Sequence, residues 1–279
     1  MADPKPDSPQ ALSGQVAVVT GAAQGLGRGI AETLASRGAT VIIADLQADK
    51  AEAVAAAAVG EGLAAAAARL DVTLTAEVDR LFADVCQTRG RLDILVNSAG
   101  LGQNVAPVVE LADEEWDQVL NVNLNGTFKC CRAAARIMER QESGCIVNLA
   151  SINGQNPAAW VAAYNVAKAG VIGLTRSLAL ELAAYGVRVN AVCPGPVYTD
   201  FNRTVMAQRC ETLGITEEEM IERIRQAIPL GRWGQPEDIA FGVANLCDPS
   251  SSWVTGEILR ISGGLEGVAA APPKRAASS

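Results

Sequence analysis

Histidine is absent from all 279 residues of this chain. Its absence excludes Ser-His-Asp and Cys-His catalysis, and it excludes zinc sites that use histidine ligands. Acid–base chemistry near neutral pH must therefore use a tyrosine, lysine, cysteine or carboxylate whose pKa is shifted. The seven cysteines form no C-x-x-C pair, and most of them lie in apolar patterns. Buried reduced thiols are therefore favoured over a redox or metal role, and we expect no bound metal.

The chain also lacks a long apolar run and a cluster of basic residues. No uninterrupted stretch approaches the roughly 20 apolar residues that a membrane helix needs. The first residues, MADPKPDSPQALSG, have no apolar core of the kind found in secretory signals. A formal net charge of −8 argues against a nucleic-acid-binding surface. We expect a cytoplasmic protein that acts on a small molecule, without a membrane or nucleic-acid partner.

Short apolar runs alternate with helical patterns along most of the chain, which predicts an α/β fold. The expected strands are residues 15–20, 40–44, 64–70, 93–97, 144–151, 187–193 and 257–261. We expect a single Rossmann-type, doubly wound domain whose seven-stranded, mainly parallel sheet has helices on both faces.

The predicted domain spans residues 12–265, with flexible tails at 1–11 and 266–279. One long helix is expected from residue 107 to about 138, bent at Gly126. The helical pattern loses its order over 197–230, directly after a strand, and we interpret this segment as a substrate loop or lid.

The first strand, turn, helix and second strand indicate a dinucleotide site. Gly21, Gly25 and Gly27 form the turn, and Asp45 ends the second strand. Glycines let the backbone approach a pyrophosphate, whose charge meets free N–H groups at the helix N-terminus. A carboxylate at Asp45 can accept hydrogen bonds from ribose hydroxyls and would repel a 2′-phosphate. We therefore expect NAD rather than NADP as the cofactor.

A second group of polar residues follows the fifth predicted strand. Ser151 comes at the end of this strand, and Tyr164 and Lys168 are four residues apart on the helix that follows. Residues at this spacing lie on one face of a helix, one turn from each other. A serine that faces a tyrosine–lysine pair can form a proton-transfer site.

Together these segments resemble the classical short-chain dehydrogenase/reductase family over about residues 12 to 265. The motifs that carry the resemblance are Thr20-Gly21-xxx-Gly25-x-Gly27, Asp71, Asn97-Ser98-Ala99-Gly100, Asn123, Ser151, Tyr164-xxx-Lys168 and Pro194-Gly195. The resemblance implies that Tyr164 is the general acid in ketone reduction and the base in alcohol oxidation. Lys168 would lower the pKa of this tyrosine, together with the positive nicotinamide ring, and hold the nicotinamide ribose. Ser151 would orient the substrate oxygen, and Asn123 would hold a water that relays the proton.

The resemblance also implies a set of cofactor contacts and an oligomer. The oligomer would be a homotetramer, with a dimer as the alternative. The implied dinucleotide contacts are Gly21, Gly25, Leu26, Gly27, Asp45, Asp71, Val72, Asn97, Ala99, Gly100, Tyr164, Lys168, Pro194, Gly195, Val197 and Thr199.

The expected activity is NAD-dependent interconversion of a secondary alcohol and its ketone. Asn153, Gln155 and Asn156, with Trp160, place several amides near the expected pocket, which favours a polyol or sugar-derived substrate. The alternative enzyme is a 3-oxoacyl thioester (acyl-carrier-protein) reductase, against which Asp45 counts because such enzymes mostly use NADPH. The alternative outside enzymes is a dinucleotide-sensing binding protein, which would be expected to lack one of the four catalytic residues.

Overall fold

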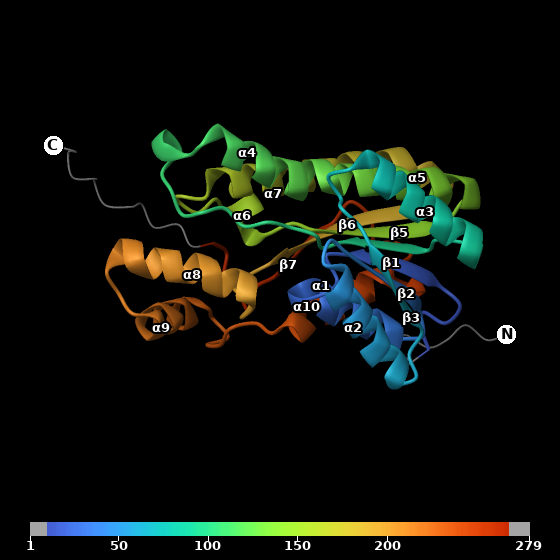
Figure 1. Ribbon diagram of the computed structural model, residues 1–279, viewed down its shortest axis with the longest axis horizontal. Coiled ribbons are helices and arrows are strands. Elements are labelled where there is room, and N and C mark those ends of the chain that lie inside the picture. The colour runs from blue at the N-terminus through green and yellow to red at the C-terminus, as the bar shows by residue number, and fades with distance from the viewer. Residues whose placement is uncertain (1–9, 268–279) are drawn as a thin grey trace.

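The computed structural model describes residues 10–267, and its centre is a seven-stranded sheet (Figure 1). Every neighbouring pair of strands is parallel, in the order β3-β2-β1-β4-β5-β6-β7, which confirms the predicted doubly wound architecture. The strands are β1 (Val16–Thr20), β2 (Thr40–Asp45), β3 (Ala65–Arg69), β4 (Ile94–Asn97), β5 (Gly144–Leu149), β6 (Val187–Pro194) and β7 (Ile258–Ile261).

Helices cover both faces of the sheet (Figure 1). One core lies under α1, α2 and α10, and a second core lies under α3, α5 and α7. The helices are α1 (Gly25–Ser36), α2 (Ala48–Gly60), α3 (Thr75–Arg89), α4 (Asp113–Leu120), α5 (Thr127–Gln141), α6 (Ile152–Gln155), α7 (Ala162–Leu182), α8 (Asp200–Leu213), α9 (Glu217–Ala227) and α10 (Pro236–Cys247).

The inner strands are mainly apolar because helices cover both of their faces. All five residues of β1 are buried, and β4 and most of β5 are buried as well. The edge strand β3 consists of four alanines and Arg69, and it is only half-buried. Alanine has little strand preference of its own. Pairing with β2, from Val41 beside Ala65 to Asp45 beside Arg69, therefore maintains this strand.

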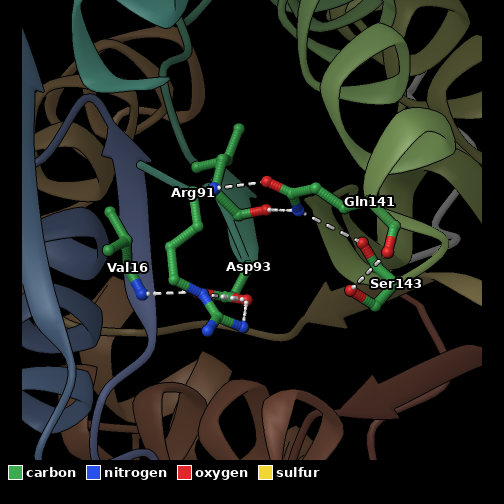
Figure 2. A network of polar contacts seen from close by, with 6 residues as sticks. Val16, Arg91, Asp93, Gln141 and Ser143 are labelled. Atoms are coloured by element: carbon green, nitrogen blue, oxygen red, sulfur yellow. Dashed lines mark hydrogen bonds and ion pairs between the residues drawn. The ribbon is translucent and has the colours of Figure 1, made fainter. Parts of the chain in front are cut away.

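Polar side chains tie the sheet together where its central strands begin (Figure 2). The Asp93 carboxylate accepts a hydrogen bond from the Val16 N–H at 2.8 Å and forms a two-pronged ion pair with Arg91. The Gln141 side chain, at the end of α5, bonds both the N–H and the carbonyl of Leu92. This network stabilises the edge of the sheet opposite the carboxyl ends of the strands.

The structure corrects the prediction of one long helix from 107 to about 138. The segment contains a 3₁₀ turn (Val108–Glu110), α4, a π-helical segment (Asn121–Gly126) and α5. Gly126 lies in the π-helical segment rather than at a simple bend, and a Cβ there would lie 2.6 Å from the Val72 side chain.

The region 197–230, expected to be a loop or lid, forms α8 and α9, which lie together at one end of the molecule (Figure 1). The predicted tails lie outside the described residues except at 10–11 and 266–267, and Ala11 is buried. Within residues 10–267, no helix has the length and apolar character needed to span a membrane.

Candidate active site

A cavity of about 870 Å³ lies at the carboxyl ends of the strands. Its walls come from the segments that follow β1, β2, β4, β5 and β6, together with α8 and α9. β1 and β4 are neighbours in the sheet, and strand order reverses between them. Ligands of open α/β sheets bind at such a switch point.

The glycine turn after β1 forms one end of this cavity. A Cβ on Gly27 would lie 2.1 Å from the Gly21 carbonyl oxygen, so only glycine allows the turn to close. Gly25 has a φ of +56°, and the space beside it is open except for the Thr199 methyl at 3.9 Å. The first turn of α1 has no capping side chain and no acidic residue. The free N–H groups of this turn and the open space beside Gly25 fit a pyrophosphate. We call the turn from Gly21 to Gly27 the glycine cradle.

Asp45 and Asp71 lie farther along the same end of the cavity. Asp45 is 7% exposed, and its carboxylate accepts hydrogen bonds from the N–H groups of Ala23 at 3.0 Å and Gln47 at 2.9 Å. These bonds hold the carboxylate at the cavity wall. Each oxygen keeps a lone pair for a further donor, such as a ribose hydroxyl. Asp71 is held by Thr73 in a similar way.

Ser151, Tyr164 and Lys168 meet at the other side of the glycine turn, where β5 and α7 approach each other. The Ser151 side chain caps α6 and is hydrogen-bonded to Tyr164. The Lys168 ammonium is buried, donates to the Leu149 carbonyl at 2.8 Å, and lies 5.7 Å from the centroid of the Tyr164 ring. All three side chains line the cavity. The three side chains that the sequence predicts to form one cluster therefore lie together in the structure.

Burial determines the proton affinities of this cluster. Desolvation raises the pKa of Tyr164 to about 12, although its hydrogen bond with Ser151 acts in the opposite direction. Desolvation lowers the pKa of Lys168 to about 8. The expectation that Lys168 and the positive nicotinamide ring together lower the pKa of Tyr164 concerns the complex with the dinucleotide, and it stays a prediction. At neutral pH the phenol keeps its proton and the lysine is mostly charged.

Asn123 lies in the π-helical segment and is fully buried. Its amide donates to the carbonyls of Leu101 at 2.8 Å and Val119 at 2.9 Å, and its side-chain oxygen accepts from the Leu101 N–H. A Cβ on Gly100 would lie 2.9 Å from this oxygen and 3.8 Å from Lys168 Nζ. Asn123 is thus near Lys168. Single π-helical turns are often found at functional sites, and this one aims Asn123 at the cavity.

Gln103 positions the start of α7. Its side-chain oxygen accepts hydrogen bonds from the N–H groups of Ala163 at 2.8 Å and Tyr164 at 3.3 Å, while the N-cap residue Val161 provides no side-chain cap. Gln103 therefore satisfies donors that the first turn of α7 would otherwise leave free. Because Tyr164 belongs to this turn, Gln103 helps to set its position.

The structure brings the sequence-predicted cofactor residues together with one exception. Asn97 does not line the cavity, because its side chain turns into the sheet. Its amide donates to Asn148 at 2.8 Å and to the Cys131 sulfur at 3.2 Å. The two asparagines are register partners on β4 and β5. The cavity is lined by the others, namely Gly21, Gly25, Leu26, Gly27, Asp45, Asp71, Val72, Ala99, Gly100, Tyr164, Lys168, Pro194, Gly195, Val197 and Thr199.

Of the four residues expected to contact substrate, only Asn153 lines the cavity. Gln155 is exposed at the end of α6. The Asn156 amide donates to the Glu266 carbonyl. Trp160 adopts a left-handed backbone with a φ of +68°, and its carbonyl accepts from the Ala106 N–H at 3.0 Å. The last three do not line the cavity, whereas the amide residues Gln103, Gln118 and Asn202 do.

α8, α9 and the segment that follows them form the substrate side of the cavity instead. We did not predict the apolar residues of this side from the sequence, although the amphipathic pattern of α9 could have indicated them. The apolar residues from this region that line the cavity are Val205, Met206, Met220, Ile224 and Trp233, and Arg209 is the charged one.

Comparison with known proteins agrees with this arrangement of fold and site. Residues 21–266 match the family model described as enoyl-(acyl carrier protein) reductase. A 3-oxoacyl-[acyl-carrier-protein] reductase of Synechocystis sp. is 38% identical over 257 residues, which cover 91% of this chain and 98% of the relative.

Solved structures give the same result. An actinorhodin polyketide ketoreductase with NADPH has a TM-score of 0.88 and 35% identity, covering 94% of this chain and 100% of that one. A putative gluconate dehydrogenase from Agrobacterium tumefaciens has a TM-score of 0.86 and 34% identity, covering 92% and 98%.

This protein is an oxidoreductase that uses a nicotinamide dinucleotide, as its fold, its glycine cradle and its Ser151–Tyr164–Lys168 cluster indicate. Within that class, the chain belongs to the short-chain dehydrogenase/reductase family.

Proposed function

We propose that this protein reduces the ketone of a 3-oxoacyl compound to a secondary alcohol. The observation that carries the proposal is the meeting of Ser151, Tyr164 and Lys168 in the cavity beside the glycine cradle. A bound nicotinamide dinucleotide supplies the hydride.

Each residue of the cluster has a role in this reduction. The hydroxyl of Tyr164 keeps its proton at neutral pH, because its pKa is raised to about 12, and it gives this proton to the ketone oxygen. Ser151 donates a hydrogen bond to the same oxygen and holds it against Tyr164. Lys168, placed 5.7 Å from the Tyr164 ring centroid, stabilises the phenolate that remains. We further propose that Asn123 takes part in returning a proton to Tyr164.

Two observations favour a 3-oxoacyl substrate over the polyol expected from the sequence. Relatives such as the Synechocystis protein are named as 3-oxoacyl reductases. The substrate side of the cavity has apolar walls, including Met206, Met220 and Ile224, and neither Gln155 nor Asn156 lines it. Apolar walls suit an acyl chain better than a chain of hydroxyls.

We propose NAD(H) as the preferred cofactor because of Asp45. Its carboxylate lies in the cavity wall at the end of β2, and a negative charge there would repel a 2′-phosphate. The basic residues closest to Asp45 in sequence have other partners: Lys50 bonds Gln24, and Arg37 bonds Asn245. Arg28, beside the glycine turn, pairs with Glu32. Against this preference stands the NADPH of the solved polyketide ketoreductase.

The test is an assay with both cofactors and both substrate classes. Oxidation of NADH or NADPH with an acetoacetyl thioester is compared with reduction of NAD⁺ by a panel of polyols. Faster turnover of the thioester supports the proposal, and turnover of polyols alone would reject it. Tyr164→Phe should lower turnover by about 10²- to 10⁴-fold without weakening dinucleotide binding. Undiminished turnover would remove the general-acid role, and tight dinucleotide binding without any turnover would favour a sensor.

We also propose that the chain forms a homotetramer and acts in the cytoplasm. Large apolar side chains are exposed near the β7 edge of the sheet: Trp253 is 99% exposed, and Phe241 and Leu259 are also exposed. An exposed edge strand with apolar neighbours favours pairing with another chain. Sedimentation equilibrium measures the assembly, and a monomer or a stable dimer would contradict the proposed tetramer.

A further inference from the structure

Arg209 is a cation without a charged partner in the wall of the cavity. It lies on α8 and is half-buried, and it lines the substrate side. Nη2 donates to the Ala159 carbonyl at 3.2 Å, which uses one of its five N–H groups. No carboxylate of the described residues pairs with it, and desolvation alone lowers its pKa. Its other N–H groups therefore have only solvent or a ligand to bind.

Charges in the cavity wall are separated by sign along its length. The acidic residues among the lining residues are Asp45 and Asp71, both at the end where β2 and β3 finish. The lining cations are Lys168, which belongs to the catalytic cluster, and Arg209. The chain as a whole carries a net charge of −8, so an isolated cation here opposes the overall charge.

A half-buried guanidinium without a charged partner is unfavourable, because desolvating a charge costs free energy unless a partner compensates. The bond to Ala159 satisfies one donor and could be made by a neutral side chain. Apolar residues around Arg209, such as Met206 on the preceding turn of α8, reduce its contact with water. Among residues 10–267 no charged group compensates this cost, so an anionic group on a bound ligand is a fitting partner.

We propose that Arg209 binds a carboxylate of the substrate and thereby makes free 3-oxo acids better 3-oxoacyl substrates than their esters and thioesters, which lack this charge. A guanidinium presents its N–H groups in a planar fork that matches the two oxygens of a carboxylate. The substrate would bind with its ketone at Ser151 and Tyr164 and its carboxylate turned toward Arg209. This inference rests on the proposed ketone reduction, and it makes Arg209 a specificity-determining residue.

The kinetic test compares kcat/KM for short 3-oxo acids and for their methyl esters, which lack the charge and carry one additional methyl group. The wild-type protein should prefer the acids, and Arg209→Gln should lower the acid-to-ester ratio by about 10- to 100-fold. Arg209→Lys keeps the charge and should keep part of the preference. An equal loss for acids and esters would assign Arg209 a purely structural role and overturn the proposal, as would a wild-type protein without preference for the acids.

Arg223→Gln provides a matched control. Arg223 lies on α9, in the same region, but it is exposed and pairs with Glu219 at 3.8 Å. This variant removes the same charge from the α8–α9 region without changing the cavity. Its acid-to-ester ratio should equal that of the wild type. A drop as large as that of Arg209→Gln would mean that net charge, rather than the cavity contact, attracts the acid, and would overturn the proposal.

Binding of an unreactive acid separates this proposal from the proposed function. Hexanoate and hexanamide are titrated into the wild-type protein and Arg209→Gln by calorimetry, with NADH at saturation. Tighter binding of hexanoate that is lost in Arg209→Gln supports the carboxylate site even if no 3-oxo compound is turned over. Equal binding of the two ligands to the wild type would overturn it even if acetoacetyl thioester is reduced.

Discussion

The N–H of Tyr164 donates a hydrogen bond to the side-chain oxygen of Gln103 at 3.3 Å. The two residues are 61 positions apart in the chain, and the bond joins the segment after β4 to the first turn of α7. The same oxygen accepts from Ala163. Gln103 therefore holds Tyr164, the proposed general acid, through its backbone N–H rather than through its hydroxyl.

Gln103→Ala should lower kcat by about 10- to 100-fold, because small displacements of a catalytic group are costly. The free energy of unfolding should fall by about 1 kcal/mol, the usual cost of losing a helix cap. Dinucleotide affinity should be unchanged. Gln103→Glu keeps the acceptor oxygen and should restore most of the turnover. If the Ala and Glu variants have the same kcat, Gln103 does not position Tyr164 through this bond.

Lys168 should make the free energy of unfolding vary with pH in the alkaline range. Burial lowers its pKa from the ordinary 10.5 to about 8, so the folded protein binds fewer protons than the unfolded chain between these values. The free energy of unfolding therefore rises with pH through this window, by ~3 kcal/mol in total for this group. Tyr164, whose pKa is raised from 10 to about 12, acts in the opposite sense, and stability falls as pH rises through that higher window.

Lys168→Met isolates the lysine from the tyrosine, which is present in both proteins. Urea unfolding from pH 7 to pH 10 should show the wild type gaining stability relative to the variant as pH rises above 8. Loss of the bond to the Leu149 carbonyl shifts the variant by a constant amount and does not change this slope. Parallel stability profiles would show that the pKa of Lys168 is not lowered.

Asp45→Ala should raise the ratio of kcat/KM for NADP⁺ to that for NAD⁺ by about 10-fold or more, since it removes the charge that opposes a 2′-phosphate. The change also leaves the Ala23 N–H without its acceptor, which costs about 1–3 kcal/mol. Asp45→Asn keeps an acceptor oxygen and separates the two effects. It should shift the ratio in the same direction with a smaller loss of stability. An unchanged ratio in both variants would contradict the proposed NAD preference.

Asp93→Ala should lower stability without changing the chemistry. The Val16 N–H and Arg91 lose their partner, and the unpaired buried donor costs about 2 kcal/mol. Because Asp93 lies where β4 begins (Figure 2), far along the sheet from Ser151, kcat should stay the same. Asp79→Ala is the control: Asp79 is exposed and lies 3.8 Å from Arg136, so its loss should change stability by less than about 0.5 kcal/mol. A reduced kcat in Asp93→Ala at a temperature where it is fully folded would contradict this separation.

Local sequence determined the architecture and the reacting group. β-branched apolar runs such as Val16–Thr20 can only be strands covered on both faces, and the spacing of Tyr164 and Lys168 places them on one helical face. The glycine turn, Asp45 and Ser151 follow strands directly, and the carboxyl ends of parallel strands meet at one edge of the sheet. These features depend on neighbours in the chain, so pattern and spacing were sufficient to predict them.

Tertiary structure alone decided which other polar residues face the cavity. Asn97 turns inward because Asn148, 51 residues away, accepts its amide hydrogen bond. Asn156 and Trp160 bond to distant backbone groups, and neither residue lines the cavity. Arg209 reaches the cavity because α8 packs across it toward Ala159, 50 residues earlier. Contacts at this separation depend on how whole elements pack, and no local pattern encodes them.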